Sequence, residues 1–135
     1  MTLTDTGPLV AMLDARDNHH ARAKATIKDI AYPLLTTEAC LTECLYLLYA
    51  DYGWRGQAAL WRLINIGALR ILTPPHDGPD RARIYMDRFQ DQPCDYADAT
   101  ILVAAEDLGH RRVFTFDRHF YAYRLTDRTA LEVIG

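Results

Sequence analysis

Four acidic side chains lie where the sequence predicts strand ends and helix faces. Asp5 and Asp117 each follow a short apolar run that we expect to be a strand. Asp98 opens an Ala-rich helical run, and Glu43 interrupts the apolar run at 40–48. Carboxylate oxygens are the ligands that Mg²⁺ and Mn²⁺ prefer, and such ions activate water for the hydrolysis of phosphodiester bonds. If the four side chains converge, the sequence predicts a metal-dependent hydrolytic site.

A fifth acid, Asp95, lies three residues before Asp98. On a helix the two side chains share a face, with their Cβ atoms about 5–6 Å apart. Two carboxylates at that distance repel each other unless a cation, a helix N-terminus or a proton compensates their charge. The same spacing fits a variant of the capping box, with Asp95 as the N-cap and Asp98 at the third helical position. The spacing alone leaves both interpretations open.

Two of the other acids also have structural alternatives. Asp5 could serve as a turn or cap residue rather than as a ligand. Glu38 competes with Glu43, because both lie in the helical run predicted at 38–50. Glu38 falls in the first turn, where the helix dipole favours an acid, and it lies about 140° around the helix from Glu43. We favour Glu43, because an acid within an apolar run must be paired, liganded or turned toward a polar cleft.

The elements that must position these side chains alternate between strands and helices. Short apolar runs predict strands at 1–5, 33–36, 68–72, 112–116 and 131–134. Helical periodicity predicts a helix that starts at Pro8 and further helices at 17–31, 38–50, 54–67, 79–90 and 95–108. This order predicts one domain, 1–135, built as a three-layer α/β/α sandwich around a parallel sheet of four to five strands. Ligands bind such sheets at the carboxyl ends of the strands.

Composition limits the choice of partner and compartment. The chain has 135 residues, a formal charge of −3, and 18 acids against 15 bases. This balance argues against a broad basic surface for nucleic acid, but it permits a small site centred on a metal ion. The three cysteines form no paired motif, so we expect buried thiols in a reducing cytoplasm and no zinc site. We expect neither a secretory signal nor a membrane span.

Four segments carry a family pattern. They are DTGPLVA at 5–11, TTEACLTE at 36–43, DYADA at 95–99 and TFDRHF at 115–120. In this order and spacing they resemble the PIN-domain family, in particular the VapC-like ribonuclease toxins of type II toxin–antitoxin pairs. The resemblance implies dependence on Mg²⁺ or Mn²⁺, endonucleolytic cleavage of structured RNA such as tRNA, a homodimer, and an antitoxin protein that covers the site.

The resemblance also assigns roles to single residues. Thr6 would help to orient the first carboxylate. The family often has a hydroxyl residue where this chain has Gly7, which puts a hydroxyl contact to metal or phosphate at that position in question. The acids that the resemblance implies as metal ligands are Asp5, Glu43, Asp98 and Asp117, with Asp95 as an accessory acid.

Contacts to RNA and to a partner protein complete these expectations. Arg118, His119 and Arg124 follow the last acid and are candidates for phosphate contact, against simple placement on the surface. Apolar and aromatic residues of the helices at 38–50 and 54–67 could accept an antitoxin helix in a groove. Two other functions stay open: a non-catalytic interaction module whose acids are caps, and a metal-dependent phosphoesterase that acts on DNA or on a small phosphate ester.

Overall fold

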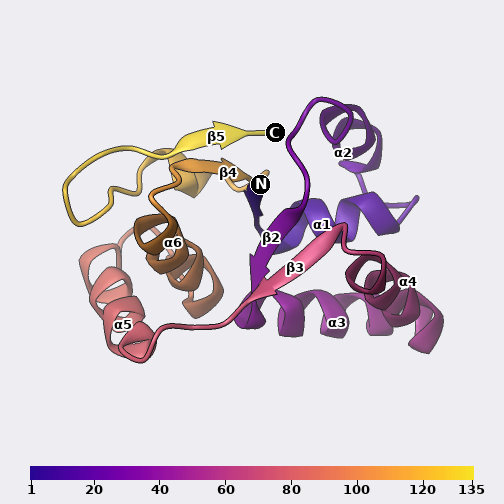
Figure 1. Ribbon diagram of the computed structural model, residues 1–135, viewed down its shortest axis with the longest axis horizontal. Coiled ribbons are helices and arrows are strands. Elements are labelled where there is room, and N and C mark those ends of the chain that lie inside the picture. The colour runs from indigo at the N-terminus through magenta and orange to yellow at the C-terminus, as the bar shows by residue number, and fades with distance from the viewer.

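The computed structural model describes residues 1–135 and contains one five-stranded sheet with helices on both faces (Figure 1). The strand order is β3-β2-β1-β4-β5, and every neighbouring pair is parallel. This confirms the predicted α/β sandwich with a central parallel sheet. The strands are β1 (Thr2–Thr4), β2 (Leu34–Thr37), β3 (Leu69–Leu72), β4 (Arg112–Phe114) and β5 (Glu132–Ile134).

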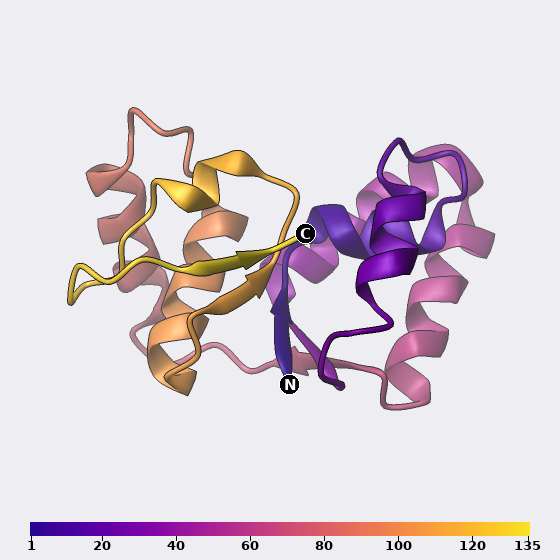
Figure 2. The same ribbon diagram turned by 90° about the horizontal axis from the view of Figure 1, so that it is seen from above.

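Six α-helices and one short 3₁₀ helix connect the strands. Figure 2 shows α5 and α6 on one side of the sheet and the helices of the first half of the chain on the other. None of these helices combines the length and the apolar character that a membrane span requires. The helices are α1 (Thr6–Leu13), α2 (His20–Thr26), α3 (Glu38–Tyr52), α4 (Trp54–Asn65), α5 (Gly78–Arg88), α6 (Tyr96–Leu108) and the 3₁₀ helix Arg118–Tyr121.

Successive strand residues point to opposite faces of the sheet, and this divides the core in two. Leu35 and Val113 belong to a cluster of 18 buried residues, most of them on one side with α5 and α6. Leu34 packs with buried residues of α1, α3 and α4 on the other side, and Phe114 packs against Ala11 of α1. Both faces of a parallel sheet are normally covered in this way, because helices form the crossover connections.

Several element boundaries differ from the sequence expectation, most of them by one or two residues. The first helix begins at Thr6 with Asp5 as its N-cap, so Pro8 is its third residue rather than its first; the free N–H groups of a first turn make proline acceptable there. The second helix covers only His20–Thr26, and no side chain caps its start. The fourth strand ends at Phe114 rather than at 116, because the hydroxyl of Thr115 already accepts the amide N–H of Asp117 and turns the chain.

Parallel strands bring their carboxyl ends to one edge of the sheet. β1 lies between β2 and β4, so the residues that follow these three strands are neighbours at that edge. Asp5 follows β1, Thr37 ends β2, and Thr115 follows β4. The edge on which the sequence placed a ligand site therefore collects segments from the beginning, the middle and the end of the chain.

Candidate active site

Asp5 is the most enclosed of the acids. Its side chain is 6% exposed. Asp5 is the N-cap of α1, and one carboxylate oxygen accepts the amide N–H of Thr6, the first helical residue, at 2.8 Å; the other accepts the hydroxyl of Thr115 at 2.9 Å. The thiol of Cys40, from α3, lies 3.8 Å from the first oxygen. The carboxylate is therefore held among β1, β4 and the start of α3.

Asp95 and Asp98 form the capping box that their spacing suggested. Asp95 accepts the amide N–H of Asp98 at 2.8 Å, and Asp98 accepts the amide N–H of Asp95 at 3.3 Å. Asp98 is 7% exposed, and the hydroxyl of the buried Tyr123 lies 3.4 Å from one of its oxygens. A cap and a ligand are not exclusive roles, because each oxygen has more than one lone pair.

Thr115 connects two of the acids, and sequence reasoning gave it no role. Its hydroxyl donates to Asp5 and accepts the amide N–H of Asp117 at 3.0 Å. Asp117 in turn caps the 3₁₀ helix, accepting the amide N–H of His119 at 2.9 Å and lying 2.7 Å from its ring Nδ1. The signal was a threonine two residues before an aspartate, a spacing at which threonine commonly accepts a backbone N–H.

Glu43 and Glu38 occupy different environments on α3. Glu43 is half-buried, and its carboxylate makes no hydrogen bond or ion pair within the chain. Its negative charge helps to raise the pKa of Asp5. Glu38 is exposed and lines a separate pocket. Of the two, Glu43 is therefore the acid whose charge acts on the Asp5 carboxylate.

The acids act on one another electrostatically. Burial raises the pKa of Asp5 to about 6, and the charges of Glu43 and Asp117 add to this against the hydrogen bonds from Thr6 and Thr115. Burial also raises the pKa of Asp98 to about 8, with the charges of Asp5, Asp95 and Asp117 as further causes. Each raised pKa reports unfavourable negative charge. A bound cation would relieve the charge at both positions.

The candidate metal ligands offer oxygen atoms, but their side chains are not arranged as a complete metal site. No three histidine, cysteine or acidic side chains lie close enough together to hold an ion as they stand. One further oxygen is available, because the hydroxyl of Thr6 is the one buried side-chain polar atom that has no hydrogen-bond partner. Carboxylate and hydroxyl oxygens fit a hard cation such as Mg²⁺ or Mn²⁺ rather than zinc.

The residues predicted to contact substrate differ in how firmly the protein holds their side chains. Thr6 is buried beside Asp5, and His119 is held by Asp117 at the exposed side of the acids. Arg118 is exposed, and its guanidinium makes no contact that would fix it. Arg124 is tied to the backbone, because its Nη1 donates to the carbonyls of Tyr121 and Tyr123, both at 2.8 Å. Of the two arginines, Arg118 is the freer to follow a substrate.

Known proteins share this architecture and much of this sequence. Residues 2–125 match the PIN domain family. The chain is 30% identical over 131 residues to ribonuclease VapC26 of Mycobacterium tuberculosis, covering 90% of this chain and 91% of that protein. The crystal structure of Mycobacterium tuberculosis VapC20, a sarcin–ricin loop cleaving toxin, superimposes with a TM-score of 0.78 at 22% identity, over 87% of this chain and 90% of that chain. From the family match and the similarity to VapC26, both over nearly the whole length, we conclude that the chain belongs to the PIN-domain family, as a VapC-like member.

Proposed function

We propose that this protein is the toxin of a toxin–antitoxin pair and acts as an endoribonuclease that requires Mg²⁺ or Mn²⁺. Its 30% identity to ribonuclease VapC26 over nearly the whole chain supports RNA as the substrate. VapC20 cleaves the sarcin–ricin loop, so the proposed substrate is structured RNA, with transfer RNA as one candidate and the sarcin–ricin loop as another. The reaction is hydrolysis of a phosphodiester bond.

The observation that carries this proposal is the convergence of acids on one edge of the sheet. Thr115 bonds to the side chain of Asp5 and to the backbone of Asp117, although the three residues come from opposite ends of the chain. Burial raises the pKa of Asp98, which lies on a different helix, and the charges of Asp5 and Asp117 raise it further. A stable protein does not need such a concentration of unfavourable charge, whereas a cation site does.

Each acid has a proposed role. Asp5 and Asp98, the two buried acids, would form the fixed side of the ion site. Glu43 and Asp117 are half-buried, so they are free to complete the site from the solvent side. Asp95 would act as an accessory acid that holds Asp98 through the capping box. An ion bound by this set supplies a Lewis acid that activates water and neutralises charge on the leaving oxygen.

The remaining residues position these groups and the RNA. The hydroxyl of Thr115 and the amide of Thr6 orient the two oxygens of Asp5. His119, held by Asp117, is close enough to the acids to contact a phosphate or the leaving oxygen. Arg118 and Arg124 would contact neighbouring phosphates, which supplies local positive charge to a chain whose net charge is negative.

A second candidate function is supported by the capping geometry. Asp5, Asp95 and Asp117 are each the N-cap of a helix, and Asp98 completes a capping box. These hydrogen bonds give four acids a structural reason to exist without any metal. A PIN-domain protein that only binds partners would keep all of them. Glu43 is the exception, because it caps nothing and has no partner within the chain.

One experiment separates these candidates. Purified protein is incubated with Mn²⁺ and a panel of structured RNA, DNA and a phosphate monoester, and Asp98→Asn is compared with Asp29→Asn, an exposed acid of the α2–β2 connection. The ribonuclease proposal expects RNA cleavage by the wild type and Asp29→Asn, with a loss of at least about a hundredfold in Asp98→Asn. Equal rates in all three proteins would contradict it. Cleavage of only DNA or the monoester would identify a different phosphoesterase.

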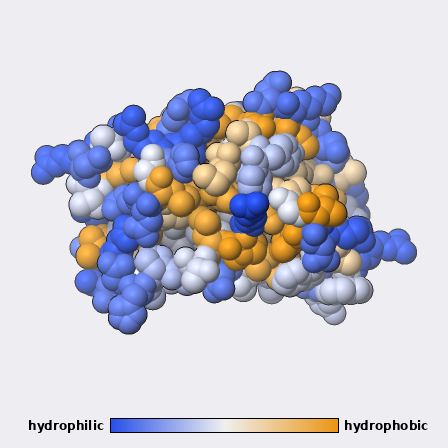
Figure 3. All heavy atoms as spheres, viewed as in Figure 1, coloured by the Kyte–Doolittle hydropathy of each residue, from blue (hydrophilic) through white to orange (hydrophobic).

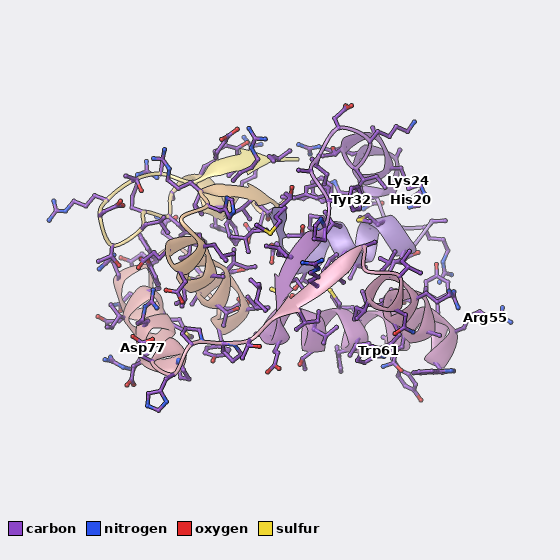
Figure 4. All side chains as sticks on the ribbon, viewed as in Figure 1. His20, Lys24, Tyr32, Arg55, Trp61 and Asp77 are labelled. Carbon is purple, nitrogen blue, oxygen red and sulfur yellow. The ribbon has the colours of Figure 1, made fainter.

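The proposed protein partner is an antitoxin segment with apolar side chains. A pocket of about 290 Å³ between α2, α4 and the sheet is lined by eight hydrophobic residues among nine. Lys24 and Tyr32, labelled in Figure 4, belong to this lining, and Figure 3 shows hydrophobic side chains gathered over the middle of this face. Ile66, which is 76% exposed, lies at the same pocket. Ile66→Asp should weaken capture of a small protein encoded beside this gene.

Exposed aromatic side chains and buried cysteines bear on the proposed homodimer and the proposed location. Tyr46 and Tyr49 on α3 are 74% and 61% exposed, and Trp54 at the start of α4 is 65% exposed. Such exposed aromatic side chains support the proposed homodimer, which analytical ultracentrifugation of wild type and Tyr46→Asp would test. The three cysteines are free and buried, in agreement with the proposed reducing cytoplasm.

A further inference from the structure

A pocket of about 200 Å³ lies next to the acids and has no role so far. It is enclosed by the start of α3, one side of α6 and the connection from β3 to α5. Figure 1 shows this connection passing beneath α6 and beside the start of α3. The volume is below the roughly 300–1,000 Å³ of pockets that hold drug-sized ligands. The space therefore suits a single ring system.

The pocket adjoins the acids through a short chain of contacts. Cys40 lies 3.8 Å from the carboxylate of Asp5 and 3.9 Å from the carbonyl oxygen of Ala97. On the pocket side, the hydroxyl of Thr100 donates to that same carbonyl at 2.6 Å and lies 2.8 Å from the hydroxyl of Thr37. The pocket thus lies on one side of the first turn of α6, and the acids lie on the other. The start of α3 lies between them. The path from Asp5 to the pocket therefore runs through the side chains of Cys40 and Thr100 and the backbone of Ala97.

The walls of the pocket suit a flat aromatic ring. Leu72 and Pro74 form one apolar side, and Ala39 and Val103 contribute to the other. Tyr96, the first residue of α6, lines the pocket and is 45% exposed. Proteins that bind single-stranded RNA commonly stack its bases on exposed aromatic rings of this kind. Tyr96 also follows Asp95 directly, so the proposed stacking ring and the capping box share one turn of helix.

Glu38 supplies the pocket with a free hydrogen-bond acceptor. The carboxylate of Glu38 lines the pocket and makes no hydrogen bond or ion pair within the chain. Two nearby hydroxyls already donate their hydrogen within the chain, because Thr42 donates to the carbonyl of Glu38 at 3.0 Å and Thr100 donates to the carbonyl of Ala97. An ionised carboxylate accepts hydrogen bonds and donates none. A ligand that binds to Glu38 must therefore present hydrogen-bond donors to it.

We propose that this pocket binds a guanine base of the RNA beside the cleaved bond, stacked on Tyr96 and hydrogen-bonded to Glu38. Guanine presents two adjacent donors, N1–H and the N2 amino group, which match the two oxygens of one carboxylate. Adenine and cytosine each place an acceptor beside their amino group, and uracil flanks its single N–H with two carbonyls. The inference rests on the proposed ribonuclease function for its role, but the binding site itself can be tested without catalysis.

The first test measures base preference during cleavage. An RNA library with randomised single-stranded positions is cut in the presence of Mn²⁺, and the cut ends are sequenced. The wild type and the matched control Glu132→Gln, an exposed glutamate of β5, should show guanine at one fixed distance from the cut. Glu38→Gln should lower that preference about tenfold or more, because an amide offers a donor where guanine also offers one. Tyr96→Ala should lower the cleavage rate at the preferred sites by a similar factor.

The second test measures binding alone. The ¹⁵N–¹H spectrum of the protein is recorded with 5′-GMP, 5′-IMP or 5′-AMP, and the amides of Tyr96, Thr100 and Ala39 report on the pocket. We expect shifts with GMP, weaker shifts with IMP, which lacks the N2 amino group, and loss of the GMP shifts in Glu38→Gln. Thermal unfolding of each variant confirms that it is folded.

The outcomes keep the two proposals apart. If the wild type cuts no RNA but GMP shifts the pocket amides selectively, the ribonuclease proposal fails and the guanine site stands. If RNA is cut without a guanine preference, or if Glu38→Gln retains that preference, the guanine site is refuted while the ribonuclease proposal survives. GMP shifts no larger than those of AMP would also refute the guanine site.

Discussion

Asp5 and Asp14 cap the two ends of α1, and each is 6% exposed. Asp14 accepts the hydroxyl of Tyr52 and the amide N–H of Arg16, and the hydrogen bond from Tyr52 is the main cause that lowers its pKa. The Arg16 side chain lies over the Tyr52 ring at 4.7 Å and adds positive charge. Burial instead raises the pKa of Asp5 to about 6, and the charges nearby are negative.

The difference between these two aspartates separates an acid with a structural role from a proposed metal ligand. Both caps accept hydrogen bonds, so capping does not distinguish them. The surroundings do. Burial, followed by the negative charges nearby, raises the pKa of Asp5, whereas the hydrogen bond from Tyr52 and the positive charge of Arg16 lower the pKa of Asp14. An acid whose charge is compensated within the chain contributes to stability. An acid whose charge is left uncompensated is available to a ligand.

The largest expected effect is on metal binding. Asp5→Asn should weaken Mn²⁺ binding by at least about a hundredfold, because it removes an anionic ligand from a site that depends on charge. Asp14→Asn, at the other end of the same helix, should leave the affinity unchanged. Isothermal titration calorimetry with Mn²⁺ measures both. Equal affinities in the two variants would remove the distinction between the ends of α1.

Thr115→Val should cause the next largest loss, again in the affinity for Mn²⁺. The valine removes the hydroxyl that donates to Asp5 and accepts from the amide of Asp117, and loss of such a supporting contact typically costs 10–100-fold in metal affinity. Thr115→Ser retains the hydroxyl and should recover most of the affinity. The same calorimetric titration measures the effect. A valine variant that binds Mn²⁺ as tightly as the wild type would show that Thr115 is a packing residue only.

The pH dependence of stability should reveal Asp5 and Asp98, the acids whose negative charge is not compensated within the chain. The raised pKa values of Asp5 and Asp98 mean that the folded protein without metal holds more protons than the unfolded chain between about pH 4 and 8. Their contribution to stability is therefore complete below pH 4 and is lost as the pH rises to about 8. Urea unfolding should show a loss of several kcal/mol across this range, because each unit of pKa shift corresponds to about 1.4 kcal/mol.

Two comparisons separate this loss of stability from the effects of other groups that titrate in the same pH range. Asp98→Asn removes one titrating group, so its stability should depend less steeply on pH than that of the wild type. Mn²⁺ at pH 8 should restore stability in the wild type and have little effect in the variant. A wild type whose stability rises between pH 5 and 8 in step with Asp98→Asn would contradict the raised pKa values.

The smallest expected effect lies at the Asp14 end. Tyr52→Phe removes the hydroxyl that bonds to Asp14 and accepts from Arg16 Nε at 3.0 Å. The loss should be about 1 kcal/mol in the free energy of unfolding, because the Asp14 carboxylate keeps its backbone hydrogen bond and the nearby arginine. Urea unfolding at pH 7 measures it. Mn²⁺ affinity should not change, and a change would mean that the two ends of α1 are coupled.

Sequence reasoning predicted the sheet because strand and helix patterns alternate clearly. It placed Asp5 at a strand end and recognised the capping box at Asp95, both of which depend on local spacing. It could not find the link through Thr115, because that contact joins residues 110 positions apart. It preferred Glu43 to Glu38 as a ligand, and it could not find the pocket beside Glu38, because α6 and the β3–α5 connection, which help to form that pocket, are far away in sequence.

The order of the strands has a consequence for how the protein is made. β1, which Asp5 follows directly, leaves the ribosome well before its neighbour β4. Until Thr115 and Asp117 have been added, 110 residues or more after Asp5, a growing chain cannot form the contacts that link these two acids. A nascent chain that ends before Thr115 would therefore carry most of the proposed metal ligands without the hydroxyl that holds the Asp5 carboxylate in place.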